Sequence, residues 1–219
     1  MKKTIQVSIV LTAVVLIALH LFYPRDGVMA IDISHHNKDV AGKVERYRPE
    51  IMIAKASEGT AFKDSKFIEH FRISSKNNIL FGAYHFLNFD KDAKKQFDNY
   101  LSAVKSTGNN GKRYNIDIKP VLDVEKNPGK PLPGFGQVRR MVREFGEECR
   151  QQFGCYPIIY CDEAFRLFYF PFDFEDYVFW IRNTLTNPIF PAAIHQYKED
   201  KNINLDFNRV FDMEKVLMP

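Results

Sequence analysis

Eight short apolar runs, most of them ending in polar or aromatic residues, recur along the chain. They lie at residues 28–34, 51–59, 79–86, 118–125, 156–160, 177–181, 192–197 and 203–207. Stretches with helical spacing alternate with the first five runs, whereas little helix separates the last three. Short buried runs that alternate with helices are typical of a parallel sheet covered by helices. The pattern therefore predicts an α/β fold with five β/α units followed by three strands.

The length of the chain fits a sheet that closes into one barrel. The chain has 219 residues, of which 45% are hydrophobic and 26% are charged, and single barrels of about 200–250 residues are common. The sequence has no repeat of solenoid period and no low-complexity tract. We expect a TIM-like barrel that forms a single domain, residues 24–219, after a separate N-terminal segment.

Residues 1–23 form that separate segment. Lys2 and Lys3 precede a mostly apolar run over residues 5–22, which is the pattern of an export signal and is about long enough to cross a bilayer. Small residues at cleavage spacing are not obvious near its end, so a cleaved signal peptide and an uncleaved membrane anchor both stay open. Either one predicts an extracytoplasmic domain that is secreted, periplasmic or membrane-anchored.

Charge, cysteine and histidine patterns argue against several classes of partner. A net charge of +4 is too small to indicate a nucleic-acid partner. Cys149, Cys155 and Cys161 fit no zinc spacing, and their odd number leaves at least one thiol unpaired, so core packing is the favoured interpretation. The adjacent His35 and His36 should point apart and lack further ligands. We therefore expect no metal and no cofactor.

The fourth apolar run carries two carboxylates close together. Asp123 and Glu125 are two residues apart at the end of an apolar stretch, and in an extended strand both side chains point the same way. Like charges in a poorly solvated place raise one pKa, so one carboxyl stays protonated near neutral pH. Cleavage of a glycosidic bond needs such a pair, because one acid protonates the leaving oxygen and one anion offsets the developing positive charge. The alternative is an exposed loop that merely contains both acids.

Other polar and aromatic residues also lie at or near the ends of the runs. In α/β barrels the loops after the strands converge at that end and carry the chemistry. Five aromatic residues offer flat rings on which a sugar can stack or which simply pack in the core: Tyr84, Phe86, Tyr160, Trp180 and Tyr197. Tyr160 and Trp180 are the favoured ones for stacking. His85 either orients a neighbour or is a hydrogen-bonded core residue, and Lys55 with Glu58 is expected to form an internal ion pair. The full set at the run ends is Asp32, Ser57, His85, Asp123, Glu125, Tyr160, Trp180, Gln196 and Asp206.

Eight motifs follow one another in a fixed order between Val28 and Phe211. They are Asp32-Ile33-Ser34, Lys55-Ala56-Ser57-Glu58-Gly59-Thr60, Gly82-Ala83-Tyr84-His85-Phe86, Leu122-Asp123-Val124-Glu125, Ile159-Tyr160, Trp180-Ile181, Gln196-Tyr197 and Leu205-Asp206-Phe207-Asn208. Together they resemble glycoside hydrolase family 25, the Chalaropsis-type lysozymes. The resemblance implies a barrel of five β/α units plus three strands. It also implies an N-acetylmuramidase that hydrolyses the β-1,4 bond between N-acetylmuramic acid and N-acetylglucosamine in peptidoglycan.

The resemblance further implies roles for particular residues. Glu125 is the general acid, and Asp123 orients the acetamido group of the substrate or stabilises the charge formed at the sugar. Asp32 is expected to be a third catalytic residue in the same cleft. The expected substrate-binding residues are Asp206, Tyr160, Trp180, His85, Tyr84 and Gln196. The implied partner is the peptidoglycan glycan strand, bound by a monomer.

Departures from the family pattern, at residues 35–38, Phe62, residues 182–183 and His195, bear on the sugar subsites. After Ser34, where the family often has an aromatic residue and then Gln-Gly, this chain has residues 35–38 with the sequence His-His-Asn-Lys, and Arg182-Asn183 follow Ile181. These differences concern substrate preference more than reaction type. A chitinase-like glycosidase also ends a strand in Asp-x-Glu, but Lys119 and Val121 replace its earlier acids. A non-catalytic cell-wall binding module is disfavoured because all the acids are present.

Overall fold

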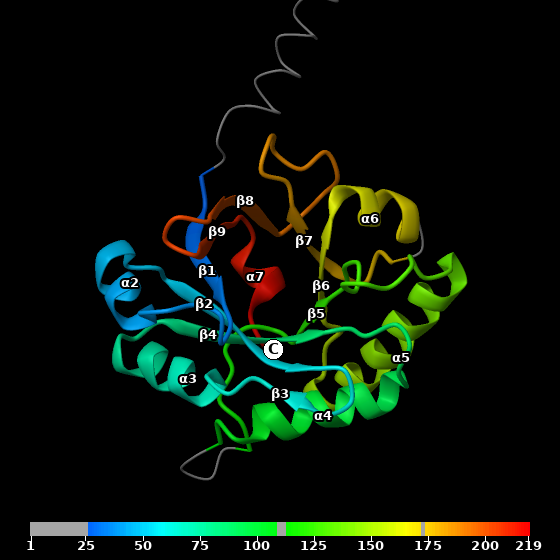
Figure 1. Cartoon of the computed structure of the whole chain (residues 1–219), viewed down its shortest axis with the longest axis horizontal. Coiled ribbons are helices and arrows are strands. Elements are labelled where there is room, and N and C mark those ends of the chain that lie inside the picture. Colours follow the sequence, from blue (N-terminus) through cyan, green and yellow to red (C-terminus); the bar gives the residue numbers. More distant parts are fainter. Residues whose placement is uncertain (1–25, 109–112, 172–173) are drawn as a thin grey trace, which may run out of the picture.

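One β-sheet closes on itself at the centre of the molecule (Figure 1). The computed structural model describes residues 26–108, 113–171 and 174–219, and the expected N-terminal segment lies outside them. In the described residues the sheet order is β1-β9-β8-β7-β6-β5-β4-β2-β3, and β1 also pairs with β2. The expected closed barrel of eight strands is therefore confirmed, with β3 as an additional strand on β2. The strands are β1 (Val28–Ile33), β2 (Ile51–Glu58), β3 (Phe62–Lys63), β4 (Leu80–Phe86), β5 (Val121–Asp123), β6 (Ile158–Asp162), β7 (Val178–Arg182), β8 (Ile194–Asp200) and β9 (Leu205–Val210).

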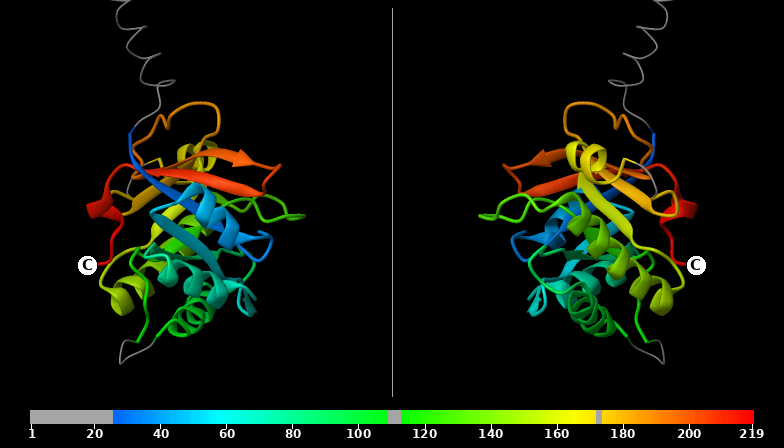
Figure 2. Two further views of the ribbon diagram at one scale, coloured as in Figure 1. Left: turned by 90° about the vertical axis from the view of Figure 1, so that its left-hand side faces the viewer. Right: turned by 90° about the vertical axis from the view of Figure 1, so that its right-hand side faces the viewer.

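Helices cover the outside of the barrel. One short helix closes the end at which the parallel strands begin, which we call the lower end; the upper end is the one at which they finish. Along the chain a helix follows each of β1, β4, β5 and β6, β3 and a helix follow β2, and β7, β8 and β9 succeed one another without a helix. The short α7 lies at the opposite end of the molecule from the loop after β5 (Figure 2). The helices are α2 (Val40–Tyr47), α3 (Phe67–Lys76), α4 (Ala93–Lys105), α5 (Phe135–Phe153), α6 (Glu163–Tyr169) and α7 (Met213–Val216).

Strand direction decides which side chains meet at the upper end of the barrel. The pairs from β1–β2 through β7–β8 are parallel, whereas β9 is antiparallel to both β8 and β1. Asp206 therefore lies at the start of β9. The sequence pattern had placed it near the end of a strand, which is wrong. Because β9 runs in reverse, its start reaches the same end of the barrel, where Asp206 is the Cα partner of Asp32.

The alternation of side chains along the strands sorts the core into two layers. Ile51 and Ile53 point into a cluster inside the barrel, together with Val216 of α7. Met52 and Ala54, the intervening residues of β2, belong to the cluster between the strands and the helices. Successive side chains of an extended strand point to opposite faces, so every second residue faces the inside of the barrel. This alternation places Asp32 on the same inner face as Ala30 of β1.

One further expectation concerns the cysteines, and the structure also shows the length and apolar character of the described helices. All three cysteines are free thiols, and Cys149 and Cys161 are buried in the core, which fits core packing rather than a bridge. Among the residues that the structure describes, none of the helices combines the length and the apolar character needed to span a bilayer.

Gly82 of β4 provides a test of packing inside the barrel. A Cβ atom there would lie 3.0 Å from Cβ of Ile118 and 3.2 Å from Cγ1 of Ile53, so Gly82→Ala should destabilise the fold by about 1–3 kcal/mol. Gly136 of α5 is the control, because a Cβ atom there meets nothing within 4 Å and Gly136→Ala should be neutral or stabilising by up to about 1 kcal/mol. Urea unfolding measures both. Equal midpoints for the two variants would contradict the packing described.

Candidate active site

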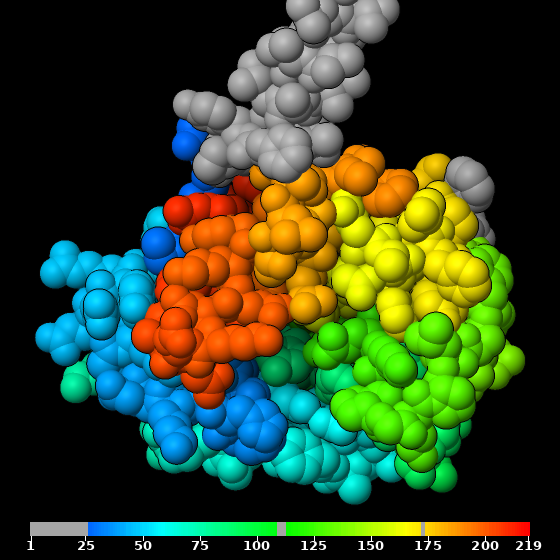
Figure 3. All heavy atoms as spheres, turned by 45° about the horizontal axis from the view of Figure 1, so that its top comes forward, coloured from blue at the N-terminus to red at the C-terminus, as the bar shows by residue number. Residues whose placement is uncertain are grey.

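A small cavity lies at the upper end of the barrel, where the strand ends meet. Its volume is about 140 Å³, and Figure 3 shows a hollow in this face between the β8–β9 hairpin, the segment after β5 and the segment after β1. Acids and aromatic residues make up nearly all of its lining. The lining residues are Asp32, Tyr84, Val121, Asp123, Glu125, Tyr160, Trp180 and Asp206.

Alternation along one segment brings the two central acids to the same face. Val121, Asp123 and Glu125 all line the cavity, as expected for residues two apart in an extended chain. Asp123 ends β5 and is 7% exposed, whereas Glu125 follows the strand and is only half-buried. Glu125 is therefore more accessible to a ligand than Asp123. The sequence prediction that both acids share one face agrees with this geometry.

Asp32 and Asp206 approach from the other side of the cavity, on adjacent strands. The two residues are Cα partners in the β1–β9 pair. Oδ1 of Asp32 accepts a hydrogen bond of 2.7 Å from Nδ2 of Asn208. Oδ1 of Asn208 in turn accepts a hydrogen bond of 2.8 Å from the indole N–H of Trp180. Asn208 thus connects β1, β7 and β9 beside the cavity.

Burial is the main reason that the pKa values of these carboxyl groups are raised. It raises the pKa of Asp32 to about 8, with a further contribution from the charge of Asp206. It raises the pKa of Asp206 to about 6, assisted by Glu199 and opposed by Arg182. The pKa of Asp123 is raised well above its usual range by burial and then by Glu125. Removal of water from a carboxylate disfavours its charged form, which explains the common direction.

Glu125 and Asp123 differ in what surrounds them. Burial raises the pKa of Glu125, but the Arg182 guanidinium opposes that shift. Oδ1 of Asp123 is buried and has no hydrogen-bond partner among the described residues. An unpaired buried acceptor is costly, so this oxygen is suited to receive an N–H or O–H group from a ligand. The site thus combines a half-buried acid with a deeper, unpaired acceptor.

A second, more open cavity of about 330 Å³ adjoins the first. It shares Glu125, Tyr160 and Asp206 with the first cavity, and Gln196 and Arg182 also line it. Arg182 forms an ion pair with Glu199 at its edge. Gln196 is 2% exposed, and its Oε1 atom has no partner in the described part of the chain. Gln196 is therefore part of the cleft, in the adjoining cavity.

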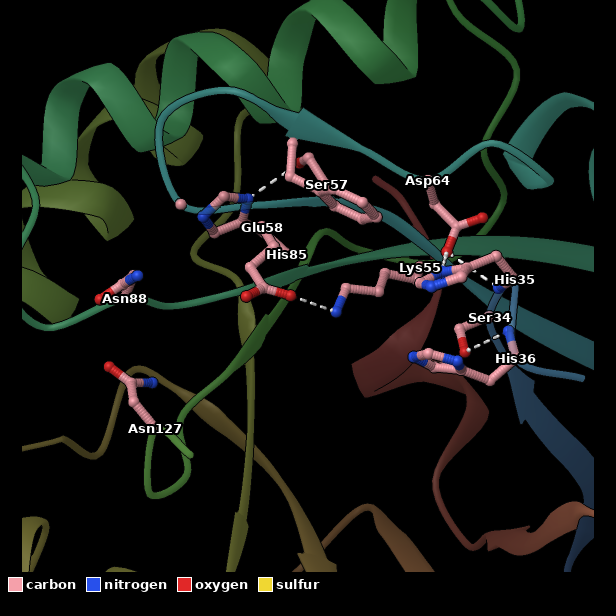
Figure 4. A network of polar contacts seen from close by, with 12 residues as sticks. Ser34, His35, His36, Lys55, Ser57, Glu58, Asp64, His85, Asn88 and Asn127 are labelled. Carbon is pink, nitrogen blue, oxygen red and sulfur yellow. Dashed lines mark hydrogen bonds and ion pairs between the residues drawn. The ribbon is translucent and has the colours of Figure 1, made fainter. Parts of the chain in front are cut away.

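Among the expected catalytic and substrate-binding residues, only His85 lines neither cavity. It is fully buried, and one ring nitrogen contacts Oγ of Ser57 at 2.8 Å, as Figure 4 shows. The other contacts Oε1 of Gln96 at 3.2 Å. The ring also stacks on Phe145 of α5, with centroids 5.3 Å apart. Because Tyr84 points into the barrel, the next residue of β4 points outward. Burial lowers the pKa of His85 to about 4, so it is a neutral core residue.

Other polar residues from the sequence analysis also form pairs outside the cavity (Figure 4). Lys55 and Glu58 form the expected ion pair, with Nζ and Oε2 2.6 Å apart. Nδ1 of His35 contacts Oδ2 of Asp64 at 2.7 Å. The rings of His35 and His36 lie 3.9 Å apart, so they do not point apart as expected for a strand; the chain turns there instead. The described residues contain no group of three or more His, Cys, Asp or Glu arranged to hold a metal ion.

The sequence analysis did not select Asn208, Arg182 or Glu199 as site residues. Asn208 stands two residues after Asp206 in one of the motifs, and the alternation along β9 would have placed both on the inner face. Arg182 was noticed only as a departure from the family pattern. Its pairing with Glu199 joins β7 to β8, and no local sequence signal indicates that contact.

Comparison with known proteins identifies the family. The family model "Glycosyl hydrolases family 25" matches residues 31–205, and the chain belongs to this family. It is 30% identical over 139 residues to "N,O-diacetylmuramidase" of Arthroderma benhamiae, covering 61% of this chain and 57% of that protein. It is 31% identical over 123 residues to "Lysozyme M1" of Streptomyces globisporus, covering 54% and 41%. The chain therefore spans about half the length of these curated relatives.

Solved structures have the same fold. A family 25 glycosyl hydrolase from Bacillus anthracis superimposes with a TM-score of 0.73 at 21% identity, covering 88% of this chain and 94% of that one. A lysozyme from Streptomyces coelicolor gives a TM-score of 0.73 at 22% identity, covering 86% and 94%. The closed barrel is thus the fold of this family.

The raised pKa of Asp32 makes stability depend on pH. The carboxyl has a pKa of about 8 when folded, against an ordinary value of 3.8. The folded protein therefore binds this proton more tightly than the unfolded chain, and stability should fall as the pH rises through this window. Urea unfolding should show that Asp32→Asn reduces the loss of unfolding free energy between pH 5 and pH 8 by about 1 kcal/mol or more. The exposed Asp98→Asn is the control, and an equal loss in both variants would contradict the assigned burial.

Proposed function

We propose that the chain is a lysozyme-like N-acetylmuramidase, which hydrolyses the β-1,4 bond between N-acetylmuramic acid and N-acetylglucosamine in peptidoglycan. The observation that carries this proposal is the cavity where Asp32, Asp123, Glu125 and Asp206 meet beside Tyr160 in a family 25 barrel. The named relatives, a muramidase and a lysozyme, support the same reaction. The glycan strand of peptidoglycan is the substrate, and the enzyme acts as a monomer.

Glu125 is the general acid in this proposal. Its half-buried position gives a substrate access, and its raised pKa keeps a proton available. That proton passes to the glycosidic oxygen as the bond to the anomeric carbon breaks. A water molecule then completes hydrolysis and returns a proton to Glu125. Tyr84, Tyr160 and Trp180 supply ring surface and polar edges for the sugar.

Asp123 acts through the N-acetyl group of the substrate. Its unpaired Oδ1 atom supports this role, since an amide N–H would satisfy it. The pKa of Asp123 is raised in the free protein, but an N–H that donates to this carboxyl favours its charged form. The acetamido oxygen then attacks the anomeric carbon as the leaving oxygen departs, and the Asp123 carboxylate offsets the positive charge of the ring that forms. Asp32 and Asp206 hold the sugar from the opposite side. Gln196 belongs to the adjoining subsite, and His85 acts as a core residue.

Residues 1–23 are a signal peptide or a membrane anchor in this proposal, and residues 24–219 are the catalytic domain. Support comes from Lys2, Lys3 and the apolar run over residues 5–22. The domain then works outside the cytoplasm, where peptidoglycan lies. We also interpret the barrel as TIM-like, with five β/α units and three closing strands, because a helix lies between each of the first five parallel barrel strands and the next.

Replacement of Glu125 tests the proposed reaction. Glu125→Gln keeps the shape of the side chain but removes its proton, and general acid catalysis contributes about 10²–10⁴-fold, so lysis of purified cell walls should fall by that factor. Mass spectrometry of the wild-type digest should show muramic acid at the reducing ends. Cleavage of chitin oligomers in place of walls would favour the chitinase-like alternative. A wild-type protein that binds walls without cutting them would be a binding module.

Replacement of Asp123 tests the acetamido-assisted route. A thiazoline analogue of the cyclised acetamido intermediate should inhibit the wild type strongly and Asp123→Asn weakly, because the variant lacks the negative charge that offsets the ring. Inhibition constants measured on soluble glycan fragments give the comparison. A covalent sugar adduct trapped on Asp123 with a slow-leaving substrate would instead identify this residue as a nucleophile.

A shortened chain tests the division at residue 24. A protein that starts at Asp26 should be soluble and should lyse isolated walls at the rate of the full-length chain, since the barrel begins at Val28. The assay compares both chains on the same wall preparation. Activity that required residues 1–23 would show that this segment belongs to the catalytic domain.

A further inference from the structure

Asn208 occupies a fully buried position beside the cavity, and none of the proposed catalytic steps uses it. Each polar atom of its side chain contacts a different cavity residue. Oδ1 accepts from the indole N–H of Trp180 at 2.8 Å, and Nδ2 donates to Oδ1 of Asp32 at 2.7 Å. The backbone of Asn208 is held on both sides, because it is the Cα partner of Ala30 on β1 and of Gln196 on β8.

The chemistry of the indole fixes which way this amide faces. An indole N–H donates and does not accept, so the amide oxygen of Asn208 must face Trp180. The NH₂ group is then left to face Asp32. As a result, Oδ1 of Asp32 must act as an acceptor. Any proton on this carboxyl is therefore carried by Oδ2, the atom that Asn208 does not hold.

We propose that Asn208 is a positioning residue, which uses the N–H of Trp180 to hold Oδ1 of Asp32 and leaves Oδ2 to carry the proton toward the cavity. The contribution of this arrangement to glycan cleavage rests on the proposed function. The hydrogen-bond pattern itself does not. In this arrangement Asp32 can donate a hydrogen bond to a sugar hydroxyl, which an ionised carboxylate cannot do.

The surroundings of Asp32 explain why the neutral amide of Asn208 matters for the titration of this carboxyl. The charges of Asp206 on β9 and Glu199 on β8 raise the pKa of Asp32. The charge of Asp32 in turn raises the pKa of Asp123 on β5. The charge of Asp32 also contributes to the raised pKa values of Tyr84 on β4 and Tyr160 on β6. The amide of Asn208 opposes burial and these acids by lowering the pKa of Asp32. Loss of that amide should therefore move the titration to higher pH.

The fluorescence of Trp180 provides a readout that does not depend on catalysis. Trp180 is the one tryptophan of the chain, so emission reports this cavity. Asn208→Asp keeps an acceptor for the indole N–H but replaces the donor to Asp32 with a second carboxylate. The pH midpoint of the emission should rise by at least about one unit, since two buried carboxylates in contact share one proton.

A matched control makes the same chemical change at a buried amide elsewhere. Asn99 of α4 is 7% exposed, and its Nδ2 atom donates to the backbone carbonyls of Gly59 and Phe62, outside the cavity. Asn99→Asp should leave the emission midpoint of Trp180 unchanged. Circular dichroism verifies that each variant is folded. If Asn208→Asp does not fold, Trp180→Phe replaces it, because it removes the indole N–H and keeps an aromatic ring, and its pH–activity profile is then compared with the wild type.

Kinetics separate positioning from a merely structural role. Asn208→Asp should lower kcat by about tenfold, the effect of one lost hydrogen bond, with little change in KM. Activity should recover at lower pH, because a protonated Asp at position 208 can again donate to Asp32. Equal emission midpoints for Asn208→Asp, Asn99→Asp and wild type would overturn the proposal. A shifted midpoint in a protein whose wild type cleaves no glycan would support the positioning of Asp32 and refute the proposed function.

Discussion

The site depends on one physical constraint: four carboxyl groups, all at least partly buried, line one small cavity. For Asp32, Asp123, Glu125 and Asp206, burial is the largest cause of the raised pKa, ahead of any single charged neighbour. A group of acids would repel if all were ionised, so the cavity retains protons near neutral pH. Retained protons are what a glycosidase requires of its acid. Burying these groups costs folding free energy, which the apolar packing of the surrounding barrel offsets.

Closure of the sheet creates that constraint. β1 pairs with β2 on one side and with β9 on the other, so Asp32 has a strand on each flank. The reversed direction of β9 brings Asp206 and Asn208 onto the inner face beside it. The apolar cluster inside the barrel, which includes Ile51, Ile53 and Val216, fills the space below. The acids are thus held above an apolar core, beside the cavity at the upper end of the barrel.

The sequence predicted local features well and long-range contacts poorly. Alternation correctly placed Asp123 and Glu125 on one face, because that geometry depends only on neighbouring residues. His85 became a site candidate only because it lies near the end of an apolar run, and that position does not tell which face of the strand its side chain occupies. The Asn208 to Asp32 bond spans 176 positions, and the antiparallel β9 that forms it leaves no signal in a periodic pattern. Contacts of this kind follow from strand order, which local periodicity does not determine.

Direct titration of the carboxyl carbons is the sharpest test of this account. Carbon NMR of protein labelled at Asp and Glu, with Asp32→Asn and Asp206→Asn used for assignment, follows each group across pH. We predict midpoints near the values of about 8 for Asp32 and about 6 for Asp206, with Asp123 titrating well above its usual range. Midpoints near the ordinary Asp value of 3.8 for all three groups would contradict the claim that shared burial raises the pKa values of these acids.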